Sequence, residues 1–200
     1  MLIAHDGKSP VVDGAAWVAP DATVCGDVTI AAGARVMHGA RVVAESGSAI
    51  RIGVNTIVME NAVVRATARH DCVIGAHCIV GPQVHIAGAM IEDEVFVATG
   101  ASVFHGAKLG RGSEVRINAV VHIKTMLEAG ATVPIGWVAV GTPAKILPPD
   151  QHDAIWAEQG PLNFPTWVYG LERTTPDLMK AIAKRLSDEL GGHRGDGDVE

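Results

Sequence analysis

The main pattern in this 200-residue chain is an aliphatic residue at every sixth position. A small residue usually follows each of them four positions later, and glycines and other turn-forming residues fill the places between. A fixed short period of this kind predicts a solenoid, in which each hexapeptide forms one short strand and one turn. The aliphatic positions form four runs: Val18, Val24, Ile30, Val36 and Val42; Ile52, Val58 and Val64; Ile74, Val80 and Ile86; and Ile91, Val97, Val103, Leu109, Val115, Val121, Leu127 and Val133.

Three hexapeptides are expected to close one triangular coil, and successive coils stack at the strand spacing of about 4.8 Å. The aliphatic residue points into the prism, and the small residue after it allows the corner to tighten. A narrow interior of this kind agrees with the composition, because the chain has 23 glycines and only 4% aromatic residues. We therefore predict an all-β solenoid over residues 1–147.

The period of six is broken at three places, where the step between aliphatic residues is ten, ten and five residues. The breaks recur at every third hexapeptide, so they fall at the same corner of successive coils. They place loops at residues 43–48, 65–72 and 87–90. Loops on a rigid scaffold often carry function, so this corner is the first place to look for a site.

The chain changes character after the repeats. Pro148 and Pro149 stop the coil, and a short helix is predicted over about residues 150–159. A second helix is predicted from about Thr175, with Pro176 at its first position. Its apolar stripe consists of Leu178, Ile182, Leu186 and Leu190. We predict a helical segment over residues 148–190, and a disordered tail over residues 191–200, which are rich in glycine and charge.

Composition argues against several partners. The net charge is −6, from 16 basic and 22 acidic residues, and the basic residues are not clustered. We therefore expect neither nucleic acid nor a membrane surface as a partner. No apolar run reaches the roughly 18 residues of a membrane span, and the first residues do not have the pattern of a secretory signal. The three cysteines, Cys25, Cys72 and Cys78, do not form a disulfide framework pattern, so we expect a cytoplasmic location.

Three stretches carry a family resemblance: VGPQVHIAG at residues 80–88, IEDEVFVATGASVFHGA at residues 91–107, and VAVGTPAKIL at residues 138–147. Across about residues 10–160 the chain resembles the γ-class carbonic anhydrases of the hexapeptide-repeat superfamily. The resemblance implies a left-handed parallel β-helix, a homotrimer, and a zinc ion bound by three histidines between subunits. The repeat and the GTPAK turn are also shared with acyltransferases of that superfamily.

The three metal-ligand positions of the family read Arg65, Pro82 and Ala87 in this chain. Family chemistry uses a zinc-bound hydroxide, which forms because the ion lowers the pKa of its bound water to about 7. The three residues here cannot replace three neutral imidazoles, and Arg65 places a permanent positive charge where the dication belongs. The family implies carbonic anhydrase activity, but we expect no zinc at these positions and no other cofactor.

Other residues at the mapped site remain candidates. In the family, a pair of residues positions the solvent. At these two places this chain has only one acidic residue, Glu60. We consider Glu60, Gln83 and His85 as catalytic candidates, with His85 as a base and Arg65 as a residue that binds an anion. The same residues could instead form the ion pairs and hydrogen bonds of a trimer interface, and buried ion pairs alone do not indicate chemistry.

Further histidines, cysteines and aromatic residues are less specific. His70, Cys72, His77 and Cys78 are close in sequence, but Cys78 occupies an inward small position and is expected to pack in the core. His105 and His122 fall near the loop-bearing corner, where related acyltransferases place a catalytic histidine in a coenzyme A cleft. The aromatic residues near the C-terminus, which are expected to dock that segment, are Trp156, Phe164, Trp167 and Tyr169.

Three functions follow from these residues. The first is a γ-carbonic-anhydrase-like trimer in which zinc-dependent CO2 hydration is lost or altered. The second is a coenzyme-A-dependent acyltransferase, and the third is a structural or binding trimer without catalysis. In each case the expected partners are further copies of the chain, with a small molecule at the subunit interface as an additional expectation.

Overall fold

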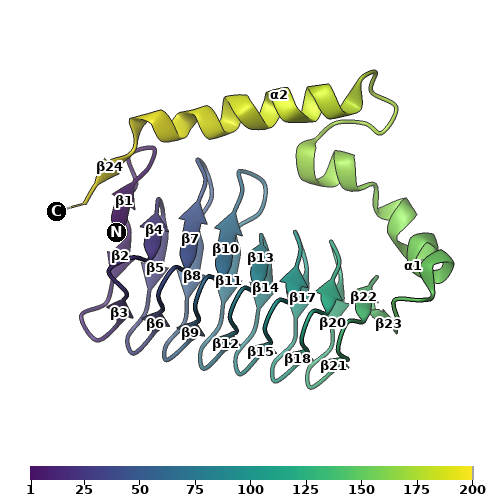
Figure 1. Ribbon diagram of the computed structural model, residues 1–200, viewed down its shortest axis with the longest axis horizontal. Coiled ribbons are helices and arrows are strands. Elements are labelled where there is room, and N and C mark those ends of the chain that lie inside the picture. Colours follow the sequence, from purple (N-terminus) through teal and green to yellow (C-terminus); the bar gives the residue numbers. More distant parts are fainter. Residues whose placement is uncertain (200) are drawn as a thin grey trace.

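The computed structural model describes residues 1–199, and most of them form a three-sided solenoid of stacked coils (Figure 1). Each full coil contributes one short strand to each of three sheets, and strands of successive coils pair in parallel. The all-β solenoid predicted from the period of six is confirmed, as is the left-handed parallel β-helix implied by the family resemblance.

The strands are short, and each sheet runs along the length of the solenoid. The first sheet has ten strands, in the spatial order β23 (Lys145–Leu147), β22 (Val138–Val140), β19 (Val120–Val121), β16 (Ser102–Val103), β13 (His85–Ala87), β10 (Val63–Ala66), β7 (Arg41–Ala44), β4 (Thr23–Cys25), β1 (Leu2–Ala4) and β24 (Gly197–Asp198). The second has seven strands: β2 (Val11–Val12), β5 (Val28–Ile30), β8 (Ile50–Ile52), β11 (Cys72–Ile74), β14 (Met90–Ile91), β17 (Lys108–Leu109) and β20 (Met126–Leu127). The third also has seven: β21 (Thr132–Val133), β18 (Glu114–Val115), β15 (Phe96–Val97), β12 (Ile79–Val80), β9 (Ile57–Val58), β6 (Arg35–Val36) and β3 (Trp17–Val18).

The register of the sheets explains the sequence pattern. Val64 pairs with Val42 on one side and with Ile86 on the other, so aliphatic residues of successive coils stack directly on one another. All three side chains are fully buried in the core. Burial of an aliphatic side chain of this size stabilises the fold by about 1.5–3 kcal/mol, and the stack repeats along every sheet.

The three breaks in the period lie between β7 and β8, β10 and β11, and β13 and β14, where the chain passes from the first sheet to the second. They therefore share one corner, as the sequence predicted. Figure 1 shows the longer loops projecting on the same side of the solenoid, after β7 and β10. We call this the loop corner and define it as residues 45–49, 67–71, 88–89, 104–107 and 122–125.

The C-terminal segment leaves the solenoid and folds back over it. Its helical elements are α1 (His152–Gln159), a 3₁₀ turn η1 (Gly160–Leu162), a π-helical turn η2 (Pro165–Tyr169) and α2 (Leu178–Leu190). The second helix begins three residues later than the sequence predicted, because Asp177 has a left-handed backbone with φ 50°. In Figure 1, α2 runs above the loop corner towards the N-terminal end of the solenoid.

The apolar stripe of α2 is only partly covered. Ile182 is buried, Leu178 and Leu186 are half-buried, and Leu190 is exposed. Leu186 and Leu190 line a small cavity of about 120 Å³ that also borders the loop corner. The stripe therefore faces the loop corner.

None of the helices in residues 1–199 has the length and apolar character needed to cross a bilayer.

The tail differs from the disorder that the sequence predicted. Residues Gly191–Gly195 form a 3₁₀ turn, η3, and β24 pairs with β1 in the antiparallel direction. Val199 N–H also donates to the Leu2 carbonyl at 2.9 Å. The physical reason is that the tail has polar partners on the solenoid, which its glycine-rich composition does not indicate.

Candidate functional site

Two of the mapped ligand positions lie one above the other. Arg65 on β10 and Ala87 on β13 are direct register partners on adjacent coils of the first sheet. Both positions adjoin the loop corner, where β10 and β13 end. Pro82 lies elsewhere, in the turn between β12 and β13. The arrangement agrees with the resemblance, which implies two stacked positions on one subunit and a third supplied by its neighbour.

Arg65 is already paired within its own chain. Its guanidinium donates to the Oε1 atom of Glu45, which follows β7 one coil away. The Glu45 side chain is 13% exposed, so it is a well-shielded carboxylate. Any anion that Arg65 could bind therefore has to compete with Glu45.

The residues at the three positions do not fit a zinc ion. Guanidinium is a permanent cation without a lone pair for a metal, and the side chains of Pro82 and Ala87 carry no donor atom. Within residues 1–199, the clusters of potential ligand atoms include none of these three residues. The chemistry of the donor set thus argues against the family's metal centre at this place.

The predicted catalytic candidates fall on one side of the solenoid. Gln83 N–H donates to the Glu60 carbonyl at 3.0 Å, so these two residues occupy equivalent turns of adjacent coils. His85 follows on β13, pairs in register with Val63 and Ser102, and points away from the core. Burial, and then the positive charge of Arg65, lowers the pKa of His85. A neutral imidazole at neutral pH is what a general base requires, and the catalytic role itself stays a prediction.

A pair of histidines at the loop corner was not anticipated as a pair. The rings of His70 and His105 lie edge to face, with centroids 5.3 Å apart. They meet over Gly88, whose φ is +56° and where an added Cβ would lie 2.4 Å from the Cβ of His70. A glycine is therefore required for His70 to fold over this coil. The sequence placed His105 at this corner, but nothing in its spacing predicted the contact with His70.

Trp167 from η2 covers the histidine pair. Its ring centroid lies 4.9 Å from that of His70, and its Nε1–H donates to the His105 carbonyl at 3.3 Å. Lys124 Nζ lies 3.9 Å from the centroid of the same indole ring. Trp167 thus docks the C-terminal segment as the sequence predicted, whereas Trp156 and Phe164 are exposed. A cavity of about 430 Å³ beside it is lined by Arg69, His70 and Lys124, together with residues of η1 and η2.

The histidines of this corner are held in the neutral form. Burial, followed by the cost of a second positive charge close to His70, His85 and the permanent cation Arg65, lowers the pKa of His105 to about 4. Burial is also the main cause that lowers the pKa values of His70 and His122. The Nδ1 atoms of His70, His105 and His122 are buried without a hydrogen-bond partner among the described residues.

We expect the folded protein to lose stability as the pH falls from 7 towards 4. The unfolded chain takes up a proton on each histidine near pH 6.5, whereas folded His105 stays neutral down to about pH 4. For His105 alone the difference corresponds to at most about 3 kcal/mol, and its partial exposure reduces this value. Thermal unfolding of the native protein and of His105→Gln across this range tests the expectation. The variant should lose less stability, and equal losses would contradict the assignment.

His70, Cys72, His77 and Cys78, which are close in the sequence, do not gather into one site. Cys72 and Cys78 are buried, and the Cys78 thiol donates to the Glu92 carbonyl at 3.1 Å. His77 is exposed in a turn between the second and third sheets. The apparent cluster in the sequence is therefore distributed between the core, the loop corner and a second corner.

Comparison with known proteins agrees with this architecture. No family model matches the chain. It is 30% identical over 146 residues to the mitochondrial gamma carbonic anhydrase 1 of Arabidopsis thaliana, which covers 70% of this chain and 50% of that relative. The chain thus spans about half the length of this curated relative.

Two solved structures resemble it along almost the whole chain. A hexapeptide transferase family protein from Anaplasma phagocytophilum matches with a TM-score of 0.50 and 23% identity, covering 95% of this chain and 96% of that one. A Bacillus cereus protein named as an acetyltransferase matches with a TM-score of 0.54 and 19% identity, covering 96% and 94%. At these identities the likeness establishes the fold alone.

Fold and sequence similarity together define a hexapeptide-repeat β-helix protein. More narrowly, this chain is a γ-carbonic-anhydrase-like protein of that class. Arg65, Pro82 and Ala87 stand at the positions that the sequence resemblance assigns to the metal ligands of the family.

Proposed function

We propose that this protein is a homotrimeric γ-carbonic-anhydrase-like protein that does not hydrate CO2 through a three-histidine zinc site. The observation that carries the proposal is the ion pair between Arg65 and Glu45. A cation, already neutralised by a carboxylate of the same chain, occupies the position that stacks on Ala87. A dication placed there would meet the positive charge of Arg65 and no imidazole from Pro82 or Ala87.

The trimer is supported by apolar side chains on the outer face of the third sheet. Ile57, Ile79 and Phe96 are consecutive register partners, and Ile79 and Phe96 are exposed. A ladder of apolar side chains on a flat face fits burial against another copy of the chain.

The cellular location is supported by the cysteines. All three are unpaired, which fits a reducing compartment such as the cytoplasm.

Stopped-flow CO2 hydration with zinc-loaded protein tests the proposal, with a γ-class enzyme as positive control. We expect little or no activity, and light scattering should report a trimer. Activity that a chelator abolishes would overturn the proposed loss of function if it persists in a His193→Ala variant, because His193 contacts Glu45 and lies outside the three mapped positions. A monomer near 20.8 kDa would overturn the assembly. A rise in the unfolding temperature with acetyl-CoA would favour the acyltransferase alternative instead.

A further inference from the structure

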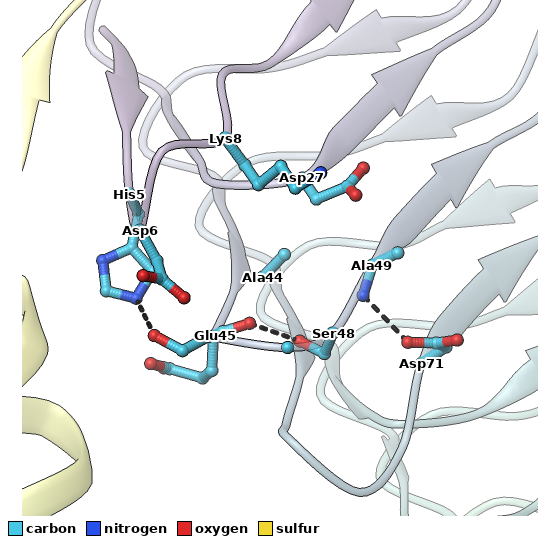
Figure 2. Close-up of a pocket in the computed structure, with 11 residues that line it drawn as sticks. His5, Asp6, Lys8, Asp27, Ala44, Glu45, Ser48, Ala49 and Asp71 are labelled. Atoms are coloured by element: carbon cyan, nitrogen blue, oxygen red, sulfur yellow. Dashed lines mark hydrogen bonds between the residues drawn. The ribbon is translucent and has the colours of Figure 1, made fainter.

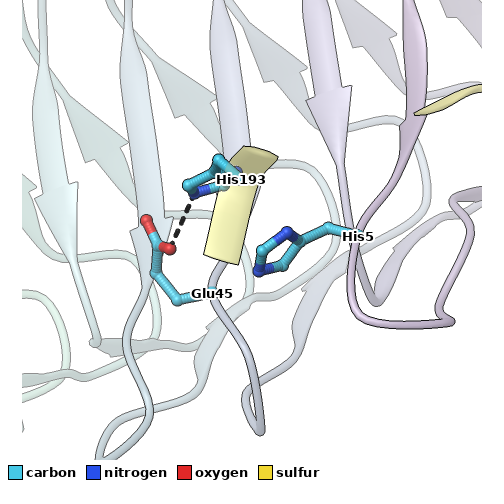
Figure 3. A group of neighbouring side chains, drawn as sticks. All are labelled: His5, Glu45 and His193. Carbon is cyan, nitrogen blue, oxygen red and sulfur yellow. Dashed lines mark hydrogen bonds and ion pairs between the residues drawn. The ribbon is translucent and has the colours of Figure 1, made fainter. Parts of the chain in front are cut away.

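A cluster of polar side chains joins the two ends of the chain to the loop corner. His5 lies in the turn after β1, Glu45 follows β7, and His193 belongs to η3, as Figure 3 shows. One ligand atom from each of the three lies within 4.8 Å of the other two. His5 is only 3% exposed, so solvent hardly reaches the cluster where His5 forms its wall. We call His5, Glu45, Ser46, His193 and Asp196 the terminal clasp.

Asp196 fixes the orientation of both imidazole rings. Its Oδ1 atom lies 2.6 Å from His5 Nδ1, and its Oδ2 atom lies 2.8 Å from His193 Nδ1. An ionised carboxylate can only accept hydrogen bonds, so both Nδ1 atoms carry a hydrogen. The rings stack with their centroids 4.2 Å apart and an angle of 24° between them. A carboxylate that accepts from Nδ1 is the usual orienting partner of a histidine that binds metal through Nε2.

The Nε2 atoms then meet oxygen atoms of the loop corner. His193 Nε2 lies 2.9 Å from Glu45 Oε2, and His5 Nε2 lies 3.0 Å from the Ser46 hydroxyl oxygen. A neutral His193 would present a lone pair to the lone pair of Glu45, and that contact is repulsive. An electrophile has to join the two atoms, either a proton on His193 or a metal ion.

The surroundings favour a cation. Arg65 holds the Oε1 atom of Glu45, which leaves Oε2 directed at the clasp. A cavity of about 350 Å³ adjoins the clasp and is lined by His5 and Glu45 (Figure 2). The cavity lining also carries three carboxylates and one ammonium group, from Asp6, Asp27, Asp71 and Lys8. Asp27 is paired with Arg51 at 2.8 Å, but the carboxylates still outnumber the cations, so the charge is net negative where the cavity meets His5 and Glu45.

We propose that His5 Nε2, His193 Nε2 and Glu45 Oε2 bind one divalent transition metal ion, with zinc as the preferred metal. Two imidazoles and one carboxylate are a donor set that zinc accepts, with a fourth position open to solvent. Asp196 is the positioning residue of this site, because it orients both rings. The site contains none of Arg65, Pro82 and Ala87, so it goes beyond the proposed function and can fail independently of it.

Zinc titration of metal-free protein by calorimetry tests this site, and the visible absorption of the Co²⁺ form gives a second readout. We expect one ion per chain in the native protein. His193→Ala and Glu45→Gln should each weaken binding by more than the roughly 10- to 100-fold that loss of an orienting partner costs. Asp196→Asn should weaken it within that range. His193 lies in the tail, so its variants can be made without disturbing the core.

The matched control is His38→Ala, because His38 also pairs with a carboxylate, Asp21, at 2.6 Å but on the exposed surface. It should bind zinc like the native protein. Folded native protein that binds no zinc, and therefore joins His193 to Glu45 through a proton, would overturn the proposal. Unchanged affinity in His193→Ala would overturn it as well. Loss of binding in Cys25→Ser but not in Glu45→Gln would replace this ligand set by the neighbouring group of Cys25, His193 and Asp196.

Discussion

A variant that carries Arg65→His, Pro82→His and Ala87→His together is expected to bind zinc between subunits. In the register of β10 and β13, positions 65 and 87 lie directly beside each other on adjacent coils, so two imidazoles can face the same point. The third imidazole, at position 82, would come from the neighbouring subunit of the proposed trimer. Three imidazoles with one open position form a complete catalytic zinc site, so affinity should rise from none to a stoichiometric ion.

The experiment is clearest in a His193→Ala background, where the terminal clasp cannot contribute metal. Metal analysis after gel filtration should give one zinc per chain for the triple variant. The variant with only Arg65→His and Ala87→His should bind at least about tenfold more weakly, because it lacks the ligand from the neighbour. An intact trimer that carries all three histidines and holds no zinc would show that the hexapeptide mapping is wrong.

Removal of residues 191–200 is expected to lower the unfolding temperature, although the sequence predicted a disordered tail there. The deletion removes the pairing of β24 with β1 and the Asp196 carboxylate that meets His5. A buried histidine left without that partner costs about 1–3 kcal/mol. Removal of residues 175–200 should destabilise further and lower solubility, because it also uncovers the loop corner that faces the apolar stripe of α2.

Thermal unfolding and light scattering of both truncated proteins measure these effects. A deletion of residues 197–200 is the control, because it removes β24 but keeps His193 and Asp196. It should retain most of the stability that the longer deletion loses. Equal unfolding temperatures for the native protein and the protein without residues 191–200 would show that the tail does not contribute to the fold in solution.

The solenoid was predictable because the aliphatic residues that form its core recur in the sequence with a short, constant period. Val42, Val64 and Ile86 occupy equivalent positions in successive coils, and their burial follows from the repeat alone. The shared corner of the loops followed from the places where the period breaks. The stripe of α2 was readable for the same reason, because side chains four positions apart lie on one face of a helix.

The terminal clasp could not be predicted in this way. His5 and Asp196 are separated by 191 positions, and the polar positions that bring them together follow no period. A histidine in a turn and another in a glycine-rich tail each resemble ordinary surface residues. The contact of His70 with His105 is equally long in range, and only the observed path of the loop over Gly88 reveals it.

The two ends of the first sheet have a consequence for assembly. A parallel β-helix exposes an unpaired coil at each end, and such an edge can template the addition of another molecule until a fibre grows. Here β24 pairs with β1, and β23 pairs with β22, both in the antiparallel direction. An incoming parallel coil would meet a strand that runs the wrong way at either end of this sheet. The short strands β24 and β23 therefore oppose end-to-end polymerisation of the solenoid.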